Sequence, residues 1–239
     1  MPFVPHRVAW TREKVARFWD YIASRDSADK YFAAQAGDDV LRHVRKHVPL
    51  DGKRVVDFGS GPGFMTEKLL KRGARVHAVD TSPDSLAQVR RRVAGAAGFD
   101  GTTLVEGLPT KLPDSSFDGA IFLETIEHLE AHDLAASLDE LGRLVRPGGF
   151  LVVTAPNEED LSASTVQCPD CGCMFHAVQH VSSWSAASLG GALRRHGFEP
   201  VATIVTTFRA PSRVKPVLDL ATRLGLGRPV NLLVVANRA

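Results

Sequence analysis

The stretch Arg54–Thr66, RVVDFGSGPGFMT, decides the fold of this chain. Its apolar pair, Val55 and Val56, predicts a short buried strand, and a glycine loop follows before a helical segment begins at Phe64. Glycines at alternate positions leave the loop without Cβ atoms, so its backbone can turn sharply and approach a ligand closely. The free N–H groups at the start of the helix point into the same turn. The stretch therefore predicts a strand–loop–helix unit that binds a ligand.

A second apolar run, Val76–Val79, ends at Asp80, seventeen residues after Gly63. In an open α/β sheet, an acidic side chain at the tip of the second strand binds the hydroxyls of a ribose. The two stretches together predict a nucleoside site, and the alternative is an ordinary strand–helix turn without a ligand. A dinucleotide site requires a third glycine where this chain has Phe64, so the pattern disfavours a nicotinamide cofactor.

Two later stretches extend the pattern. Ser116–Asp118 lead into an apolar run that is followed by Glu124–Leu129, ETIEHL, and Arg146–Gly149, RPGG, precede another apolar run. With the G-x-G-x-G loop, these motifs resemble the class I S-adenosylmethionine-dependent methyltransferases over roughly residues 50–160. The S-F-D and E-h-h-E-H-h patterns (h, apolar) are similar to the branch that includes ubiquinone-pathway O-methyltransferases.

This resemblance implies an α/β fold with a doubly wound, mostly parallel seven-stranded sheet and helices on both faces, a Rossmann-like methyltransferase fold. It implies that S-adenosylmethionine is the cofactor. Glu106 would then receive the adenine amino group, although another alignment places Leu108, which accepts no hydrogen bond, at that position. Asp57 would orient the glycine loop or meet the amino group of the methionine moiety. The implied cofactor-binding residues are Asp57, Gly59, Ser60, Gly61, Gly63, Asp80, Thr81, Glu106, Phe122 and Leu123.

The rest of the chain alternates apolar strand-like runs with helical segments, which predicts a mostly parallel sheet covered on both faces. The predicted strands are 54–58, 75–79, 103–106, 119–123, 149–155, 201–208 and 232–236. The predicted helices are 64–72, 83–97, 132–144 and 186–196, with a shorter one near 214–224.

Residues 1–50 form the predicted N-terminal helical lid, and residues 51–239 the methyltransferase domain. Aromatic side chains of such a segment more often pack in the core. In the resembled family, however, the segment covers the mouth of the cofactor site, so Trp19, Tyr31 and Phe32 are candidate lid residues.

A Cys/His-rich insertion at 158–182 follows the predicted fifth strand. Cys168 and Cys171 share one turn, and His176 and His180 are four residues apart, so they would share a face if helical. These four side chains are a candidate structural Zn²⁺ site, with Cys173 as a spare ligand. The alternatives are free thiols and histidines that line the acceptor pocket, or a redox pair.

Methyl transfer from a sulfonium is an in-line displacement, in which the enzyme mainly aligns acceptor, methyl and sulfur in a dry pocket. A hydroxyl acceptor also benefits from a base, and histidine titrates in the right range. His128, after the fourth strand, is the candidate catalytic base. Its alternative role is to hold the adjoining helix in place.

The resulting hypothesis is a methyltransferase that acts on a small molecule, most favourably at a hydroxyl oxygen. The alternatives are a catalytically silent methyltransferase-like binding or scaffold protein and, less favoured, a nicotinamide-dependent oxidoreductase.

Composition argues against several other classes. The net charge of +2 across 239 residues gives no basic surface of the kind that binds nucleic acid, so no nucleic-acid partner is expected. No apolar run approaches a transmembrane length, and the N-terminus lacks the plan of a signal peptide. Three cysteines within six residues do not make a secreted disulfide framework. The expected location is cytoplasmic.

Overall fold

The computed structural model describes residues 3–24, 31–208 and 229–239. The short helix predicted near 214–224 lies outside these residues. Within them, no helix is long and apolar enough to cross a bilayer.

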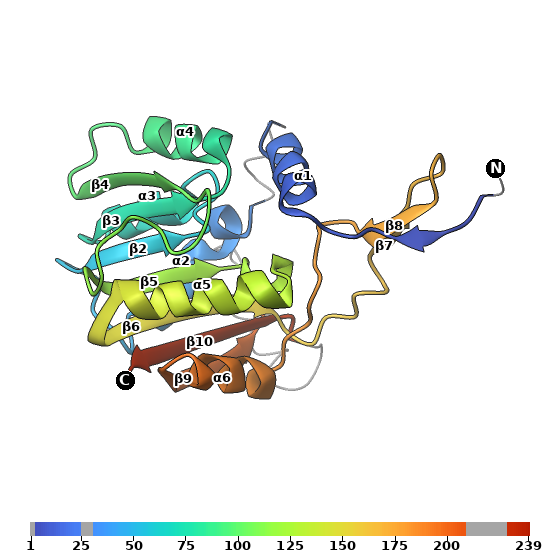
Figure 1. Ribbon diagram of the computed structural model, residues 1–239. Coiled ribbons are helices and arrows are strands. Elements are labelled where there is room, and N and C mark those ends of the chain that lie inside the picture. Colours follow the sequence, from blue (N-terminus) through green and yellow to red (C-terminus); the bar gives the residue numbers. More distant parts are fainter. Residues whose placement is uncertain (1–2, 25–30, 209–228) are drawn as a thin grey trace, which may run out of the picture.

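A seven-stranded sheet forms the centre of the molecule (Figure 1), with strand order β4-β3-β2-β5-β6-β10-β9. The first five strands in this order run parallel, and β10 is antiparallel to both of its neighbours. The strand order reverses between β2 and β5, and ligands of open α/β sheets bind outside the carboxyl ends of the strands at such a point. The strands are β2 (Arg54–Phe58), β3 (Arg75–Asp80), β4 (Phe99–Leu104), β5 (Phe117–Leu123), β6 (Val145–Pro156), β9 (Phe198–Thr206) and β10 (Asn231–Arg238).

Helices cover both faces of this sheet, because successive side chains of a buried strand point to opposite faces. Val55 packs with the layer of α2 (Phe32–Val44) and α3 (Phe64–Leu70), next to which α4 (Pro83–Arg92) covers β3. Val56 packs with the layer of α5 (Ala131–Leu144) and α6 (Ala186–Arg195), which lie in front of the sheet in Figure 1. The predicted doubly wound α/β fold is confirmed.

A second, three-stranded sheet was not predicted. It consists of β1 (His6–Arg7), β8 (Cys173–His176) and β7 (Thr165–Gln167), in that order. Figure 1 shows it to one side of the main sheet, beyond α1 (Arg12–Ser24). The region predicted as an insertion therefore contains a β-hairpin, and the start of the chain adds a parallel strand to it.

Several element boundaries differ from the predicted ones. The third strand was placed at 103–106, but β4 begins at Phe99, which packs against the cluster of Ala78, Val89 and Val93. Gly98 and Gly101, which break a strand pattern in the sequence, lie at positive φ at the start of β4 and at an irregularity in its pairing. The helix predicted at 83–97 ends at Arg92, because the chain turns at Gly95 with φ of 73°.

Candidate active site

A cavity of about 680 Å³ opens at the carboxyl ends of β2, β3 and β5, where the strand order reverses. The glycine loop forms one side of it. Helix α1 and the segment around His180 form the other side. The sequence-predicted residues in its wall are Gly59, Ser60, Gly61, Asp80, Thr81, Glu106, Phe122, Leu123, His128 and His180.

The glycine loop turns through three residues in the left-handed region, with φ of 76° at Gly59, 51° at Gly61 and 84° at Gly63. An added Cβ would lie 2.6 Å from Thr125 Oγ1 at Gly59 and 3.1 Å from Val89 Cα at Gly63. At Gly61 the nearest atom would be 3.9 Å away, so this residue presents bare backbone to open space in the cavity wall. Gly59 and Gly63 allow close packing, whereas Gly61 allows a ligand to approach.

Asp80 ties the loop to the second strand. Its Oδ2 accepts a hydrogen bond from the Gly61 N–H at 2.8 Å, and its Oδ1 accepts one from the Ser82 N–H at 2.8 Å. Burial raises the pKa of this carboxyl. Asp80 therefore holds the loop in shape and also faces the cavity, where its remaining lone pairs can accept ligand hydroxyls.

Asp57 lies beneath the loop and outside the cavity wall. It is 2% exposed, and its Oδ2 accepts a hydrogen bond from Thr66 Oγ1 at 2.6 Å. Burial raises the pKa of Asp57 to about 7. This geometry supports a role in orienting the start of α3. Gly63, the N-cap residue of α3, also lies outside the wall.

The two alignments for the adenine position lead to the same wall of the cavity, because Glu106 and Leu108 both line it. Phe122 and Leu123, at the end of β5, line the adjoining part.

The three candidate lid residues, Trp19, Tyr31 and Phe32, all line the cavity. The Trp19 indole N–H donates to Gln179 Oε1 at 2.9 Å, and its ring meets the His128 ring edge-on at 4.8 Å. Gln179 Nε2 in turn donates to the His128 carbonyl at 3.0 Å. These contacts fix α1 over the side of the cavity that faces the glycine loop.

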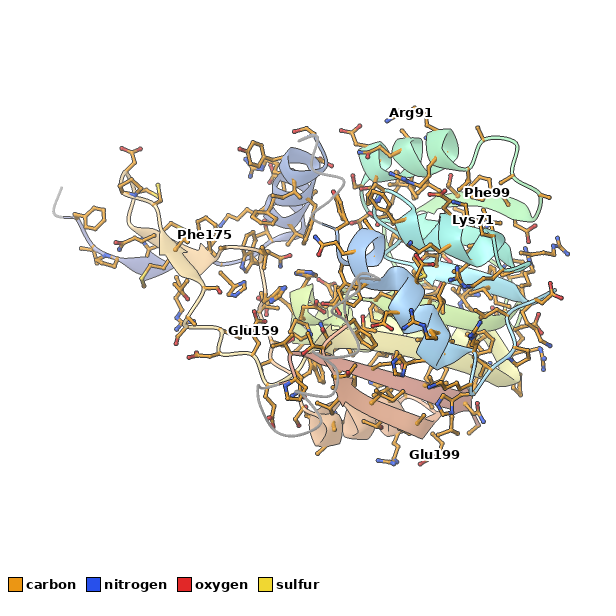
Figure 2. All side chains as sticks on the ribbon, turned by 180° about the vertical axis from the view of Figure 1, so that it is seen from behind. Lys71, Arg91, Phe99, Glu159, Phe175 and Glu199 are labelled. Atoms are coloured by element: carbon orange, nitrogen blue, oxygen red, sulfur yellow. The ribbon has the colours of Figure 1, made fainter. Side chains whose placement is uncertain are left out.

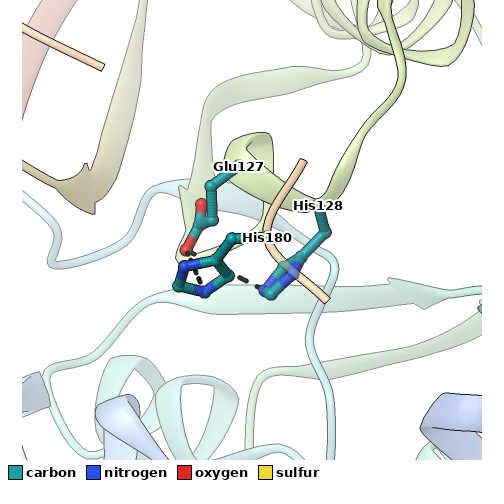
Figure 3. A group of neighbouring side chains, drawn as sticks. All are labelled: Glu127, His128 and His180. Atoms are coloured by element: carbon teal, nitrogen blue, oxygen red, sulfur yellow. Dashed lines mark ion pairs between the residues drawn. The ribbon is translucent and has the colours of Figure 1, made fainter. Parts of the chain in front are cut away.

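Six acidic and histidine side chains, here called the Glu–His cluster, gather on this side. Glu127 Oε1 lies 3.9 Å from His128 Nε2 and 3.9 Å from His180 Nε2 (Figure 3). His180 Nδ1 lies 2.5 Å from Glu159 Oε2. The rings of His176 and His180 stack at 4.6 Å. The members are Glu124, Glu127, His128, Glu159, His176 and His180.

Glu127 is the member of the cluster with the fewest hydrogen bonds to its side chain. It is 1% exposed, and neither of its carboxylate oxygens has a hydrogen-bond partner among the described residues. Burial, and then the nearby Glu124 carboxylate, raise the pKa of Glu127 well above its ordinary value. A buried carboxyl without a hydrogen-bond partner is costly, and the cost is relieved either by a raised pKa that keeps the group neutral or by a bound group that pairs with it.

Burial also shifts the pKa values of the neighbouring residues. Burial raises the pKa of Glu124 to about 7. Burial, and then the neighbouring His180, lower the pKa of His128 to about 3, so its imidazole is neutral with a free lone pair. Glu124, Glu158 and Gln179 also adopt positive φ of 44°, 49° and 60° in or beside the cluster. Such strain in non-glycine residues gathers at functional sites.

The structure does not bring the four residues of the predicted metal site, Cys168, Cys171, His176 and His180, together as one group. Among the described residues, the metal-ligating atoms gather into two groups, Glu127 with His128 and His180, and Glu159 with His176 and His180. Neither group includes Cys168 or Cys171. The reason is that β8 is extended, so His176 lies three residues, or about 10 Å, beyond Cys173 along the strand. The prediction assumed a compact turn.

The sequence analysis missed Glu124, Glu127, Glu159 and Gln179 as site residues. The spacing E-x-x-E-H was visible in the sequence, and it places Glu124, Glu127 and His128 around the short helical turn after β5. Glu159 comes from the segment that leaves β6 (Figure 2) and carried no comparable signal.

Comparison with known proteins identifies the family of this chain. The sequence model of the methyltransferase domain family matches residues 12–203. The chain belongs to the class I S-adenosylmethionine-dependent methyltransferases. A ubiquinone biosynthesis O-methyltransferase from Xylella fastidiosa is 34% identical over 119 residues, which are 49% of this chain and 47% of that protein. A trans-aconitate 2-methyltransferase from Methylobacterium nodulans is 36% identical over 141 residues, covering 58% of this chain and 50% of that protein.

This family member thus spans about half the length of the curated relatives it matches. A 1,6-didemethyltoxoflavin-N1-methyltransferase from Burkholderia thailandensis, solved with S-adenosylhomocysteine, superposes with a TM-score of 0.64 at 20% identity, over 99% of this chain and 93% of that one. The [4+2]-cyclase SpnF superposes with a TM-score of 0.69 at 16% identity, over 97% of this chain and 98% of that one. At these identities the superpositions show the shared fold alone.

Proposed function

We propose that this protein transfers the methyl group of S-adenosylmethionine to a hydroxyl oxygen of a small molecule. The observation that carries the proposal is the shared cavity. It has the bare Gly61 backbone and Asp80 on one side, and on the other the buried Glu127 carboxyl, which has no hydrogen-bond partner among the described residues. One side suits a nucleoside, and the other suits a group that must lose a proton.

The residues of the first side fit the cofactor. Gly61 leaves room for close backbone approach, Asp80 offers acceptor lone pairs to a ribose, and Phe122 and Leu123 give an apolar wall. S-adenosylmethionine supplies an electrophilic methyl group when bound. The protein then has to hold the acceptor oxygen in line with that methyl and exclude water.

The second side favours oxygen as the acceptor atom. A hydroxyl needs help to lose its proton, whereas a neutral amine attacks with its own lone pair. Glu127 and His176 are buried and the other four members of the Glu–His cluster are half-buried, so their polar atoms need partners within the cluster, on the acceptor or on a bound ion. Their concentration beside the cavity therefore supports O-methylation.

A divalent cation fits this cluster better than a free base does. With a pKa of about 3, His128 is a weak proton acceptor at neutral pH, because an efficient base has a pKa near the working pH. The same neutral imidazole is a good metal ligand, and the ligating atoms of Glu127, His128 and His180 all lie within 4.8 Å of one another. We propose these three residues as ligands of Mn²⁺ or Zn²⁺, which would lower the pKa of an acceptor hydroxyl.

Glu159 supports this arrangement from behind. Its contact with His180 Nδ1 fixes the orientation of that ring and directs Nε2 toward Glu127. A carboxylate behind a ligating histidine is the usual second partner in metal sites.

The wall around the cluster indicates the body of the acceptor. Trp10, Trp19, Leu129 and Val178 line this part of the cavity. A flat aromatic or otherwise apolar molecule with an accessible hydroxyl fits such a wall. The O-methyltransferase name of one relative supports the acceptor atom.

The cofactor is tested by titration calorimetry of the purified protein. We expect a heat of binding with S-adenosylhomocysteine and none with NADH. Binding of NADH alone, or of neither ligand, would overturn the cofactor assignment.

The acceptor side is tested by transfer of labelled methyl to matched aromatic alcohols and amines, with and without added Mn²⁺. We expect transfer to an alcohol that chelation abolishes, and Glu127→Gln should bind S-adenosylhomocysteine normally but lose the response to Mn²⁺. Glu130→Gln, at the exposed rim of the same cavity, is the matched control and should respond like the wild type. Transfer that survives chelation refutes the cation and leaves the cofactor assignment standing.

A further inference from the structure

Outside the active site, three cysteines and His6 lie in the small three-stranded sheet and in the turn that joins β7 to β8. Cys173 begins β8 and is the parallel partner of His6 in β1. On the other side of β8, the last registered pair with β7 is Gln167 with Met174. The next pair in this register is Cys168 with Cys173, and the Cys168 N–H donates to the Cys173 carbonyl at 2.8 Å. Cross-strand partners share a face of a sheet. His6, Cys173 and Cys168 therefore form one row on one face.

The turn that joins β7 to β8 brings the third sulfur next to this row. The Gly172 N–H donates to the Cys168 carbonyl at 2.9 Å, and Gly172 has φ of 77°. The backbone N–H groups of Cys171 and Asp170 and the Cys171 thiol all face the Cys168 sulfur. A turn of this kind presents the Cys168 and Cys171 sulfurs side by side.

Apart from the contact of Phe175 with Trp10, whose ring centroids lie 6.2 Å apart, the small sheet has little packing to hold it together. Both residues of β1 and all three of β7 are exposed, and β8 buries only His176, which faces the Glu–His cluster. Phe3 and Val4, which precede β1, are 54% and 62% exposed. Sheets this short and this exposed need packing or a cross-link to persist in water. A structural metal supplies that in units too small for a core.

We propose that Cys168, Cys171, Cys173 and His6 bind a structural Zn²⁺ ion that fastens β1 to the β7–β8 hairpin. Three thiolates and one imidazole are a common tetrahedral set for this ion. His6 Nδ1 lies 3.3 Å from the Val4 carbonyl, a contact that leaves Nε2 for the metal. On binding, the three thiols release their protons to the solvent.

The three sulfurs and the His6 nitrogen must move closer together to bind one ion. The two groups within 4.8 Å contain none of these four residues, so the proposal requires their side chains to rotate inward. Cross-strand Cβ atoms lie about 5 Å apart, and Zn–S bonds are about 2.3 Å long, so ligands in one row can converge on an ion between them without a change of register.

This ion is distinct from the cation proposed at the Glu–His cluster, and the experiment separates the two. The full chain is loaded with Co²⁺, which reports thiolate ligation by an intense charge-transfer absorption, and zinc is measured by mass spectrometry after dialysis. We expect the wild type to retain zinc and to show the thiolate band. Cys168→Ser and Cys171→Ser should lose both, whereas His180→Ala should keep the band.

Three results would overturn the proposal. One is a wild type without a thiolate band. The second is a band that survives in Cys168→Ser and Cys171→Ser. The third is a disulfide between Cys168 and Cys171 in freshly purified protein, shown by two thiols fewer on titration under denaturing conditions. His6→Ala tests the fourth ligand separately: we expect at least tenfold weaker Zn²⁺ binding, and unchanged affinity would remove His6 from the set.

Discussion

Gly59, Gly61 and Gly63 adopt the same left-handed conformation for different reasons. Two of them let neighbouring elements pack closely, with Thr125 against Gly59 and Val89 against Gly63, and one leaves an open space for a ligand. An added methyl group should therefore affect folding at one position and binding at another.

Gly61→Ala should weaken S-adenosylhomocysteine binding at least tenfold, because its Cβ would project into the cavity wall. The free energy of unfolding of this variant should fall by only about 1–2 kcal/mol, the cost of an alanine in the left-handed conformation. Gly63→Ala should destabilise the fold by roughly 2–5 kcal/mol, since strain adds to the contact with the Val89 backbone. Urea denaturation and calorimetry of both variants check this, and unimpaired binding by Gly61→Ala would contradict it.

Asp57 should make the stability depend on pH. Its pKa is about 7 in the folded protein, above its unfolded value, so the folded state binds the extra proton. The free energy of unfolding that this group contributes is fully present below about pH 4 and is lost as the pH rises through 7.

Asp57→Asn keeps an acceptor for Thr66 and removes the titration. Between pH 4 and 8, the wild type should lose a few kcal/mol more than the variant. Urea denaturation at several pH values measures the difference. Parallel curves for the two proteins would show that Asp57 does not titrate in this range.

At the scale of elements, the main sheet was predictable because each of its central strands is a compact apolar run beside glycine or proline. The small sheet was not, because its strands have two to four mostly exposed residues and one of them pairs across more than 160 positions, His6 with Cys173. Local patterns carry no information about such pairings.

The active site also has a part that local sequence patterns predict and a part that they do not. The glycine loop and Asp80 were predictable because one strand–loop–helix unit and the next strand position them. The split of the cysteines from His176 and His180 depended on β8 being extended, which its sequence does not reveal. The part of the cluster near Glu127 depends on the E-x-x-E-H spacing, and the part near Glu159 depends on tertiary folding alone.

The contact between α1 and the segment after β8 includes a hydrogen bond from Trp19 to the fully buried amide of Gln179. Trp19→Phe keeps the ring but leaves Gln179 Oε1 without its donor, and Gln179 is 0% exposed. We expect a loss of about 1–3 kcal/mol in the free energy of unfolding, the cost of an unsatisfied buried acceptor. Trp10→Phe, in the same cavity wall, is the control for ring size. Equal losses in the two variants would refute the role of the hydrogen bond.

For the molecule as a whole, the cavity joins three parts that are far apart in sequence. These are the carboxyl edge of the main sheet, α1, and the segment between β8 and α6. A ligand that bridges them should reduce the local opening of the two outer parts.

Hydrogen–deuterium exchange should therefore slow in residues 12–24 and 176–181 when S-adenosylhomocysteine and Mn²⁺ are both bound. Residues 186–195 of α6 do not line the cavity and serve as the internal reference. Protection confined to the glycine loop would show that the ligands do not connect these parts.

The position of β10 also governs the order in which the molecule can assemble. It follows β9 in the chain but lies between β6 and β9 in the sheet. During synthesis on the ribosome, β9 therefore has no partner strand until residues 231–238 emerge, and β6 keeps a bare edge until then. Nascent chains halted before that point should depend on chaperones, because unpaired apolar edges invite aggregation.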